Sequence, residues 1–311
     1  MGRGRQLPQL TGGTFVTDGG METTLIFDAG LDLPHFASFV LLDDEQGTAA
    51  LRDYYRPYVE TAREHGGGIV LDTPTWRANP DWGARLGYSL DALADVDRRA
   101  VALLEELRAE SGDEPPIVIC GCIGPRGDGY RVDELMSAHE AEEYHAPQIA
   151  AFAATTADMV GALTMTYANE AIGIVRAAER NGIPVAVSFT VETDGRLPSG
   201  QPLREAIEQV DAETSQSAAY FMINCAHPTH FAHVLDDDGS WIDRIRGVRA
   251  NASRKSHAEL DEAEELDAGD PDELAREYRD LSGRLRELTI VGGCCGTNSS
   301  HIGAMCAVMT A

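Results

Sequence analysis

The sequence is poor in lysine and has no long apolar run. Lys255 is the only lysine among 311 residues, and it lies in an acidic segment, which argues against Schiff-base chemistry on a lysine. No apolar stretch reaches the roughly 20 residues that a membrane-spanning helix needs. The first residues have no apolar core of the kind found in signal peptides. We therefore expect a cytoplasmic protein without a membrane partner.

Positive charge is also scarce overall. Lysine and arginine together number 25 against 51 aspartates and glutamates, which gives a formal net charge of −26. Nucleic acid and anionic membrane surfaces would be repelled by such a chain. We expect small-molecule substrates and no nucleic-acid partner, and the sequence leaves homo-oligomer formation open.

Cysteine is sparse too, but three of the cysteines are placed in an informative way. The six in the chain are too few for a secreted disulfide framework. Cys225, Cys294 and Cys295 each follow a short apolar run, and 294 − 225 = 69 positions separate the first two, which excludes a local zinc knuckle. Three sulfurs would leave a tetrahedral Zn²⁺ one open position, as in catalytic sites. Buried small residues, or a disulfide between the two neighbours, are the alternatives.

Short apolar runs alternate with helical patterns along the chain, which indicates repeated βα units. Strands are expected at about 14–18, 68–72, 116–121, 159–164, 184–189, 220–224, 245–250 and 288–292. Helices are expected at 48–65, 90–110, 138–156, 169–180, 202–217, 271–285 and 301–310. Eight units predict an α/β fold, a (β/α)₈ TIM barrel formed by residues 1–311 as one domain, with its active site at the C-terminal ends of the strands.

Two segments fall outside this alternation. The range 21–46 is expected to be a long loop of the kind that builds barrel active sites. The acidic range 253–272 is expected to be a solvated insertion, with a lid over the site as the alternative.

Motifs at the strand ends resemble those of the homocysteine S-methyltransferase family across nearly the whole chain. They are Asp18-Gly19-Gly20-Met21, Gly121-Cys122-Ile123-Gly124-Pro125, Ser188-Phe189-Thr190, Asn224-Cys225 and Gly292-Gly293-Cys294-Cys295-Gly296. Smaller matches are Tyr144-His145-Ala146-Pro147-Gln148, Gly200-Gln201-Pro202-Leu203 and Asn251. The resemblance implies a (β/α)₈ barrel, Zn²⁺ as cofactor on Cys225, Cys294 and Cys295, and a role in methionine biosynthesis.

The same resemblance implies a set of substrate-binding residues. In the family the turn after the first strand meets the amino-acid acceptor, and its glycine N–H groups receive the acceptor carboxylate. The implied residues are Asp18, Gly19, Gly20, Thr73, Trp76, Asn224 and Asn251. An aromatic face at Trp76 would suit a cationic methyl donor through cation–π attraction.

Two departures from the family pattern concern the acceptor. Leu163 stands where the family has a glutamate that receives the ammonium of homocysteine, and leucine cannot bind an ammonium. Glu22 lies two positions from the acid that usually precedes Leu25, and it is a candidate to compensate. We expect the acceptor to differ from homocysteine or to be held differently.

The expected function is transfer of a methyl group from a sulfonium or quaternary-ammonium donor to a zinc-activated thiol, homocysteine or a related one. Coordination of a thiol to Zn²⁺ favours the thiolate, which is the nucleophile. One alternative is a barrel that binds zinc and a thiol without turnover. Another is a methyltransferase or demethylase for a different methylated amine or sulfur compound that needs a separate corrinoid partner.

The remaining cysteines and the histidines have less specific predictions. Cys120 and Cys122 are expected to share a strand face as packing residues, with a second metal site as the alternative, and Cys306 is expected in the core. His227 and His230 are expected to face solvent or to donate hydrogen bonds near the metal.

Overall fold

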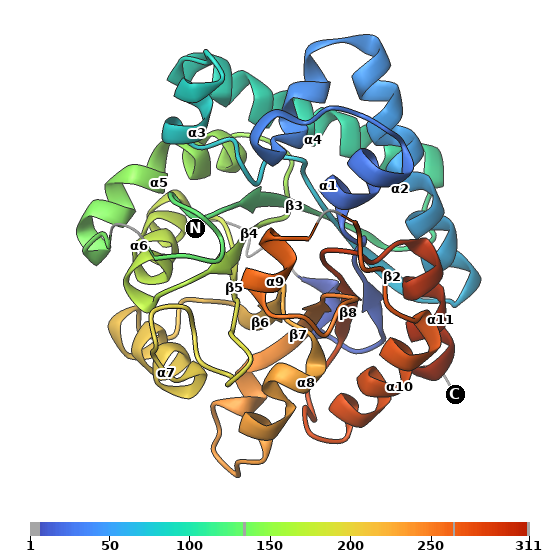
Figure 1. Cartoon of the computed structure of the whole chain (residues 1–311). Helices are drawn as coiled ribbons and strands as arrows, with labels where there is room; N and C mark the ends of the chain where they lie inside the picture. Colours follow the sequence, from blue (N-terminus) through green and yellow to red (C-terminus); the bar gives the residue numbers. More distant parts are fainter. Residues whose placement is uncertain (1–6, 133–134, 264, 310–311) are drawn as a thin grey trace.

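The computed structural model describes residues 7–132, 135–263 and 265–309. Within them eight parallel strands close a barrel in sequence order, with β8 paired to β1 (Figure 1). The strands are β1 (Phe15–Val16), β2 (Gly68–Asp72), β3 (Ile117–Ile123), β4 (Met159–Met165), β5 (Val185–Phe189), β6 (Tyr220–Asn224), β7 (Ile245–Ala250) and β8 (Ile290–Gly293). Every bound lies within two residues of the expected one, so the predicted (β/α)₈ barrel is confirmed.

Long helices surround the barrel, and each runs back along the outside after a strand (Figure 1). They are α2 (Glu45–Glu64), α4 (Leu90–Ser111), α5 (Ala138–Ala153), α6 (Ala168–Asn181), α7 (Leu203–Glu213), α10 (Pro271–Ser282) and α11 (Ser299–Met309). Asp270 is the N-cap of α10, since its side chain accepts a hydrogen bond from the Glu273 N–H at 2.8 Å. Thr310, where the last helix was expected to end, lies outside the described residues. No helix in the described ranges has the length and apolar character needed to cross a membrane.

Apolar side chains form two separate layers. One fills the barrel interior and includes Phe15, Val118 and Met222, and the other lies between the strands and the helices. Leu7 packs into the interior layer beside the first residues of β4 and β6, and Gln9 Nε2 contacts Met159 Sδ at 3.2 Å. The N-terminal segment therefore closes one end of the barrel and leaves the end where the strands finish for chemistry.

Several short helices lie at that open end, where the sequence predicted loops. The expected long loop 21–46 contains α1 (Met21–Thr23) and further helical turns at 24–28, 34–36 and 38–43. Two more short helices are α3 (Pro80–Arg85) and α8 (Pro228–Phe231), and both begin with a proline after a capping side chain. Helical periodicity cannot be recognised in four to six residues, although the capping signals were present.

The acidic segment 253–272 is not simply a solvated insertion. It contains α9 (His257–Asp261), and the side chains of Ser253 and His257 are buried. His257 Nε2 lies 2.6 Å from the carbonyl oxygen of Cys225, so α9 lies over the strand ends near β6 and β7, as Figure 1 shows. The alternative prediction, that this segment covers the site, agrees better with these contacts.

Candidate metal centre and substrate pocket

Three cysteine sulfurs lie together at the open end of the barrel. One ligand atom from each of Cys225, Cys294 and Cys295 falls within 4.8 Å of the others. Cys225 and Cys294 are joined by a disulfide, with their Cα atoms 5.4 Å apart, and Cys295 is free. The sequence considered only a disulfide between neighbours, so this pairing was not predicted.

The donor set fits a single Zn²⁺ once the disulfide is reduced. A Zn–S distance of about 2.3 Å in a tetrahedral site puts two sulfurs about 3.8 Å apart. This distance falls within the 4.8 Å that limits the separations of the three cysteine sulfurs here. Burial raises the pKa of the Cys295 thiol, so an added positive charge is what would stabilise its thiolate form. These residues would supply three ligands and leave one position for a substrate sulfur.

Unusual backbone conformations place these sulfurs. Cys225, directly after β6, has φ of 54°, and Gly296 after the cysteine pair has φ of 79°. A β-carbon on Gly20 would lie 2.6 Å from the carbonyl oxygen of Cys294, so only glycine allows the turn after β1 to approach β8 this closely. The predicted sharp turn after β8 is therefore present, and the turn after β1 packs against it.

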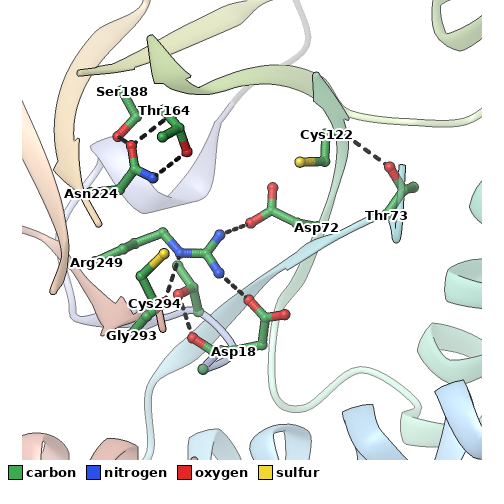
Figure 2. Close-up of polar contacts among 12 residues, drawn as sticks. Asp18, Asp72, Thr73, Cys122, Thr164, Ser188, Asn224, Arg249, Gly293 and Cys294 are labelled. Carbon is green, nitrogen blue, oxygen red and sulfur yellow. Dashed lines mark hydrogen bonds and ion pairs between the residues drawn. The ribbon is translucent and has the colours of Figure 1, made fainter. Parts of the chain in front are cut away.

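The Asn224 side chain makes four hydrogen bonds, one of them to the sulfur of Cys225. Its Oδ1 accepts from the Thr164 N–H at 2.9 Å and from the Ser188 hydroxyl at 2.7 Å. Its Nδ2 donates to Thr164 Oγ1 at 2.8 Å and to Cys225 Sγ at 3.2 Å. Thr164 has φ of 63°, an unfavourable conformation for a β-branched residue, and the Asn224 contacts stabilise it (Figure 2). Asn224, which the sequence predicted as a substrate residue, thus positions the turn that carries Cys225.

The backbone of Cys225 is fixed from the other side. Its carbonyl oxygen accepts hydrogen bonds from Asn251 Nδ2 at 3.0 Å and from His257 Nε2 at 2.6 Å. Because a carbonyl can only accept, Nε2 of His257 carries a proton, and its Nδ1 faces Glu192 Oε1 at 3.1 Å. Asn251 was predicted to bind substrate, but it is buried behind Cys225 and is not among the described residues that line the pocket.

Tyr130 connects the loop after β3 to the sulfurs. Its ring stacks on His257 with centroids 4.1 Å apart, and its hydroxyl lies 3.3 Å from Cys295 Sγ. Neither Tyr130 nor His257 was singled out from the sequence, because Tyr130 lies in a loop without a recognisable motif and His257 begins a five-residue helix in an acidic segment.

A pocket of about 200 Å³ opens directly above the sulfurs. Nine of the ten predicted substrate or metal residues and several unpredicted ones contribute to it. Its lining includes Asp18, Gly19, Gly20, Glu22, Thr73, Trp76, Arg77, Tyr130, Leu163, Asn224, Arg249 and all three cysteines. Leu163 forms an apolar wall, so the expected loss of the ammonium-binding glutamate is visible in the pocket itself.

An ion-pair cluster occupies the pocket floor. The guanidinium of Arg249, on β7, contacts the carboxylates of both Asp18 and Asp72, and its Nε donates to the Gly293 carbonyl at 3.2 Å (Figure 2). Tyr54 donates to the second Asp18 oxygen at 3.0 Å. Burial raises the pKa of Asp18 to about 7, with the Asp72 charge adding to it, although Arg249 and Tyr54 favour the ionised form. The two carboxylates raise the pKa of Arg249, which therefore stays charged.

The turn at Gly19 and Gly20 is engaged within the protein. The Gly20 N–H donates to the Thr297 carbonyl at 2.9 Å, and the Gly19 carbonyl accepts from the Tyr54 hydroxyl at 3.1 Å. Use of the Gly20 N–H by a substrate carboxylate, as the family resemblance implied, would require its bond to Thr297 to open.

Thr73 and Trp76, the two residues after β2 that were predicted to bind substrate, already contact other groups of the protein. The Thr73 hydroxyl accepts from the Cys122 N–H at 2.8 Å. The guanidinium carbon of Arg77 lies 4.1 Å from the ring centre of Trp76 and 4.1 Å from that of Trp82. One face of Trp76 is therefore already covered by a protein cation, which limits its predicted contact with a cationic donor.

Cys120, Cys122, His227 and His230 are not part of the sulfur cluster formed by the described residues. Burial raises the pKa of the Cys120 and Cys122 thiols far above the ordinary value, which agrees with the packing role predicted for them. His227 and His230 are both buried, so the expectation that they face solvent is wrong. Burial lowers the pKa of His227 to about 4, and His230 Nε2 lies 2.9 Å from the carbonyl of Arg254.

Sequence reasoning missed Arg249 and Asp72, yet a signal for them was present. Arg249 interrupts the apolar strand 245–250, and Asp72 ends the wholly buried strand 68–72. Opposite charges within two apolar strands of one barrel predict a buried ion pair.

Comparisons with known proteins bear on the family and the fold. A homocysteine S-methyltransferase family model matches residues 15–309. The oxidised form of the homocysteine methyltransferase MmuM from Escherichia coli is 19% identical with a TM-score of 0.73, covering 94% of this chain and 95% of that one. The metallated form of MmuM is 20% identical with a TM-score of 0.72, covering 95% and 96%.

At these identities the solved structures support the fold, whereas the family model rests on sequence. A search of curated proteins found no match. The predicted family resemblance is confirmed: because the family model spans nearly the whole chain, this protein belongs to the homocysteine S-methyltransferase family of methyl-transferring enzymes.

Proposed function

We propose that this enzyme uses zinc on Cys225, Cys294 and Cys295 to transfer a methyl group from a sulfonium or quaternary-ammonium donor to a thiol, which is homocysteine or a related compound. The observation that carries the proposal is the convergence of the three sulfurs at the base of an enclosed pocket. Zinc, when bound, would hold the acceptor sulfur as a thiolate. The E. coli relative, described in oxidised and metallated forms, is consistent with sulfurs that serve either as a disulfide or as metal ligands.

The surrounding residues have the tasks of positioning and of excluding water. Asn224 and His257 fix the sulfur and the backbone of Cys225, respectively. Met21, Trp76 and Leu163 supply apolar walls. Holding two reactants in line can lower a barrier by roughly 7–11 kcal/mol, and an onium donor leaves as a neutral molecule, so no general acid is required.

The test is methyl transfer by reduced, zinc-loaded protein. A donor with a deuterated methyl group, S-methylmethionine or glycine betaine, is incubated with a panel of thiols, and methylated products are measured by mass spectrometry. We expect deuterated thioether with the wild-type protein and none with Cys225→Ser. Thiol binding without product would instead support a binding protein, and product only after addition of a corrinoid protein would support the demethylase alternative.

A further inference from the structure

Four carboxyl groups line the pocket, and three of them lie near an arginine. Asp18 and Asp72 share Arg249, and Asp128 lies 4.0 Å from Arg77. Glu22 differs, because in the described parts of the chain no arginine, lysine or histidine lies within ion-pair distance of its carboxylate. Its Oε1 accepts a hydrogen bond from the Ser38 hydroxyl at 2.8 Å, which orients the group without neutralising its charge.

Glu22 is tied closely to the sulfur-bearing turn. The next residue, Thr23, accepts a hydrogen bond from the Gly296 N–H at 3.2 Å, directly after Cys295. Burial, and in addition the charge of Glu22, raise the pKa of the Cys295 thiol. The carboxyl group therefore faces the space in which substrates would meet the sulfurs.

The other described residues of the pocket provide few groups that could bind a substrate cation. Leu163 is apolar, and the Asp18 and Asp72 carboxylates are already paired with Arg249. Burial raises the pKa of Glu22, although the Ser38 hydrogen bond and the more distant charges of Arg77 and Arg249 favour its ionised form, so burial still carries a net cost for the carboxylate. A ligand cation would remove this cost by supplying the missing charge.

We propose that Glu22 is the counter-charge for an organic cation in this pocket and takes over the task that Leu163 cannot perform. This inference rests on the proposed function. The cation has two sources, the ammonium group of an amino-acid thiol and the onium group of the methyl donor. Both would place a positive charge beside Glu22 while the reacting carbon or sulfur points to the cysteines.

Two matched ligand pairs separate the sources by titration calorimetry on reduced, zinc-loaded protein. L-homocysteine is compared with 4-mercaptobutanoate, which lacks only the ammonium. Glycine betaine is compared with 3,3-dimethylbutanoate, in which carbon replaces the charged nitrogen. Each ligand is titrated into the wild type, Glu22→Gln and the control Glu60→Gln, which removes the same charge from the exposed face of α2. Thermal melting and zinc content verify that the variants fold and bind metal.

Glu22→Gln should weaken binding of the ligand that carries the ammonium group by about ten-fold or more, and should not weaken binding of the partner without it by more than about two-fold. A loss confined to homocysteine identifies the acceptor ammonium, and a loss confined to betaine identifies the donor. Equal losses for both members of each pair, or no preference of the wild type for either cation, would overturn the inference. Methyl transfer by the wild-type enzyme is measured separately, so the proposed function stands or fails independently of this result.

Discussion

Replacing Arg249 by methionine should destabilise the barrel strongly, because it leaves two buried carboxyl groups without their shared cation. The side chains of Asp18 and Asp72 are only 2% and 8% exposed. Removing one partner of a buried ion pair typically costs about 3–5 kcal/mol. At roughly 2.1 cal/mol/K of unfolding entropy per residue, this corresponds to a fall in Tm of roughly 5–8 °C for a chain of this length.

The loss of stability in Arg249→Met should depend on pH in a defined direction. In the wild type the pKa of Asp18 is already raised from 3.8 to about 7, so the folded state holds a proton that the unfolded chain releases, and stability falls as pH rises across this window. Without Arg249 the pKa of Asp18 should rise further, and the variant should lose more stability at pH 8 than at pH 5.5.

Thermal unfolding at the two pH values, followed by circular dichroism, measures both effects. Arg249→Lys is the matched variant, since it keeps the charge but cannot contact two carboxylates with a planar fork, and it should fall between the wild type and Arg249→Met. A decrease of less than about 1 kcal/mol, or an equal decrease at pH 5.5 and pH 8, would refute the reasoning.

Three further predictions concern the metal centre. Cys295→Ser should reduce bound zinc from about one ion per chain to near zero by atomic absorption, because two sulfurs hold zinc poorly; full retention would exclude this sulfur as a ligand. His257→Phe keeps a stacking ring but deletes a hydrogen bond, so urea unfolding should show a loss of about 1–2 kcal/mol, whereas His139→Phe, at a 76% exposed side chain, should change little. Gly20→Ala places a β-carbon 2.4 Å from a threonine hydroxyl oxygen and should cost about 1–3 kcal/mol. By contrast, Gly303→Ala, in open space within α11, should stabilise by about 0.5–1 kcal/mol, and a reversed order would contradict the close-contact argument.

The barrel was predictable because its strands are short, mostly apolar runs that alternate with helical patterns. Ranges such as 220–224 and 245–250 match the observed strands at both ends. The convergence of the cysteines followed from the same pattern, since parallel strands of a barrel finish on one face. Their separation of 69 positions could be bridged only by a fold in which β6 and β8 are near neighbours.

The partners of the site residues could not be predicted in the same way. Asn224 was recognised from a motif, but its hydrogen bonds to Thr164 and Ser188 join three strands and depend on three-dimensional register. His257 stands in an acidic segment whose composition suggests only exposure to solvent, yet one buried contact with Cys225 decides its role. Composition describes the average of a segment, and a single inward-facing side chain is lost in that average.

The amide of Asn224 links one apolar wall of the pocket to the geometry of the sulfurs. Leu163, which lines that wall, precedes Thr164, and Thr164 shares the Asn224 side chain with Cys225 Sγ. A substitution that reshapes β4 to admit another ligand would therefore also shift Cys225, a proposed zinc ligand. Attempts to alter acceptor choice in this enzyme should be screened for metal affinity at the same time, since the two properties are mechanically coupled.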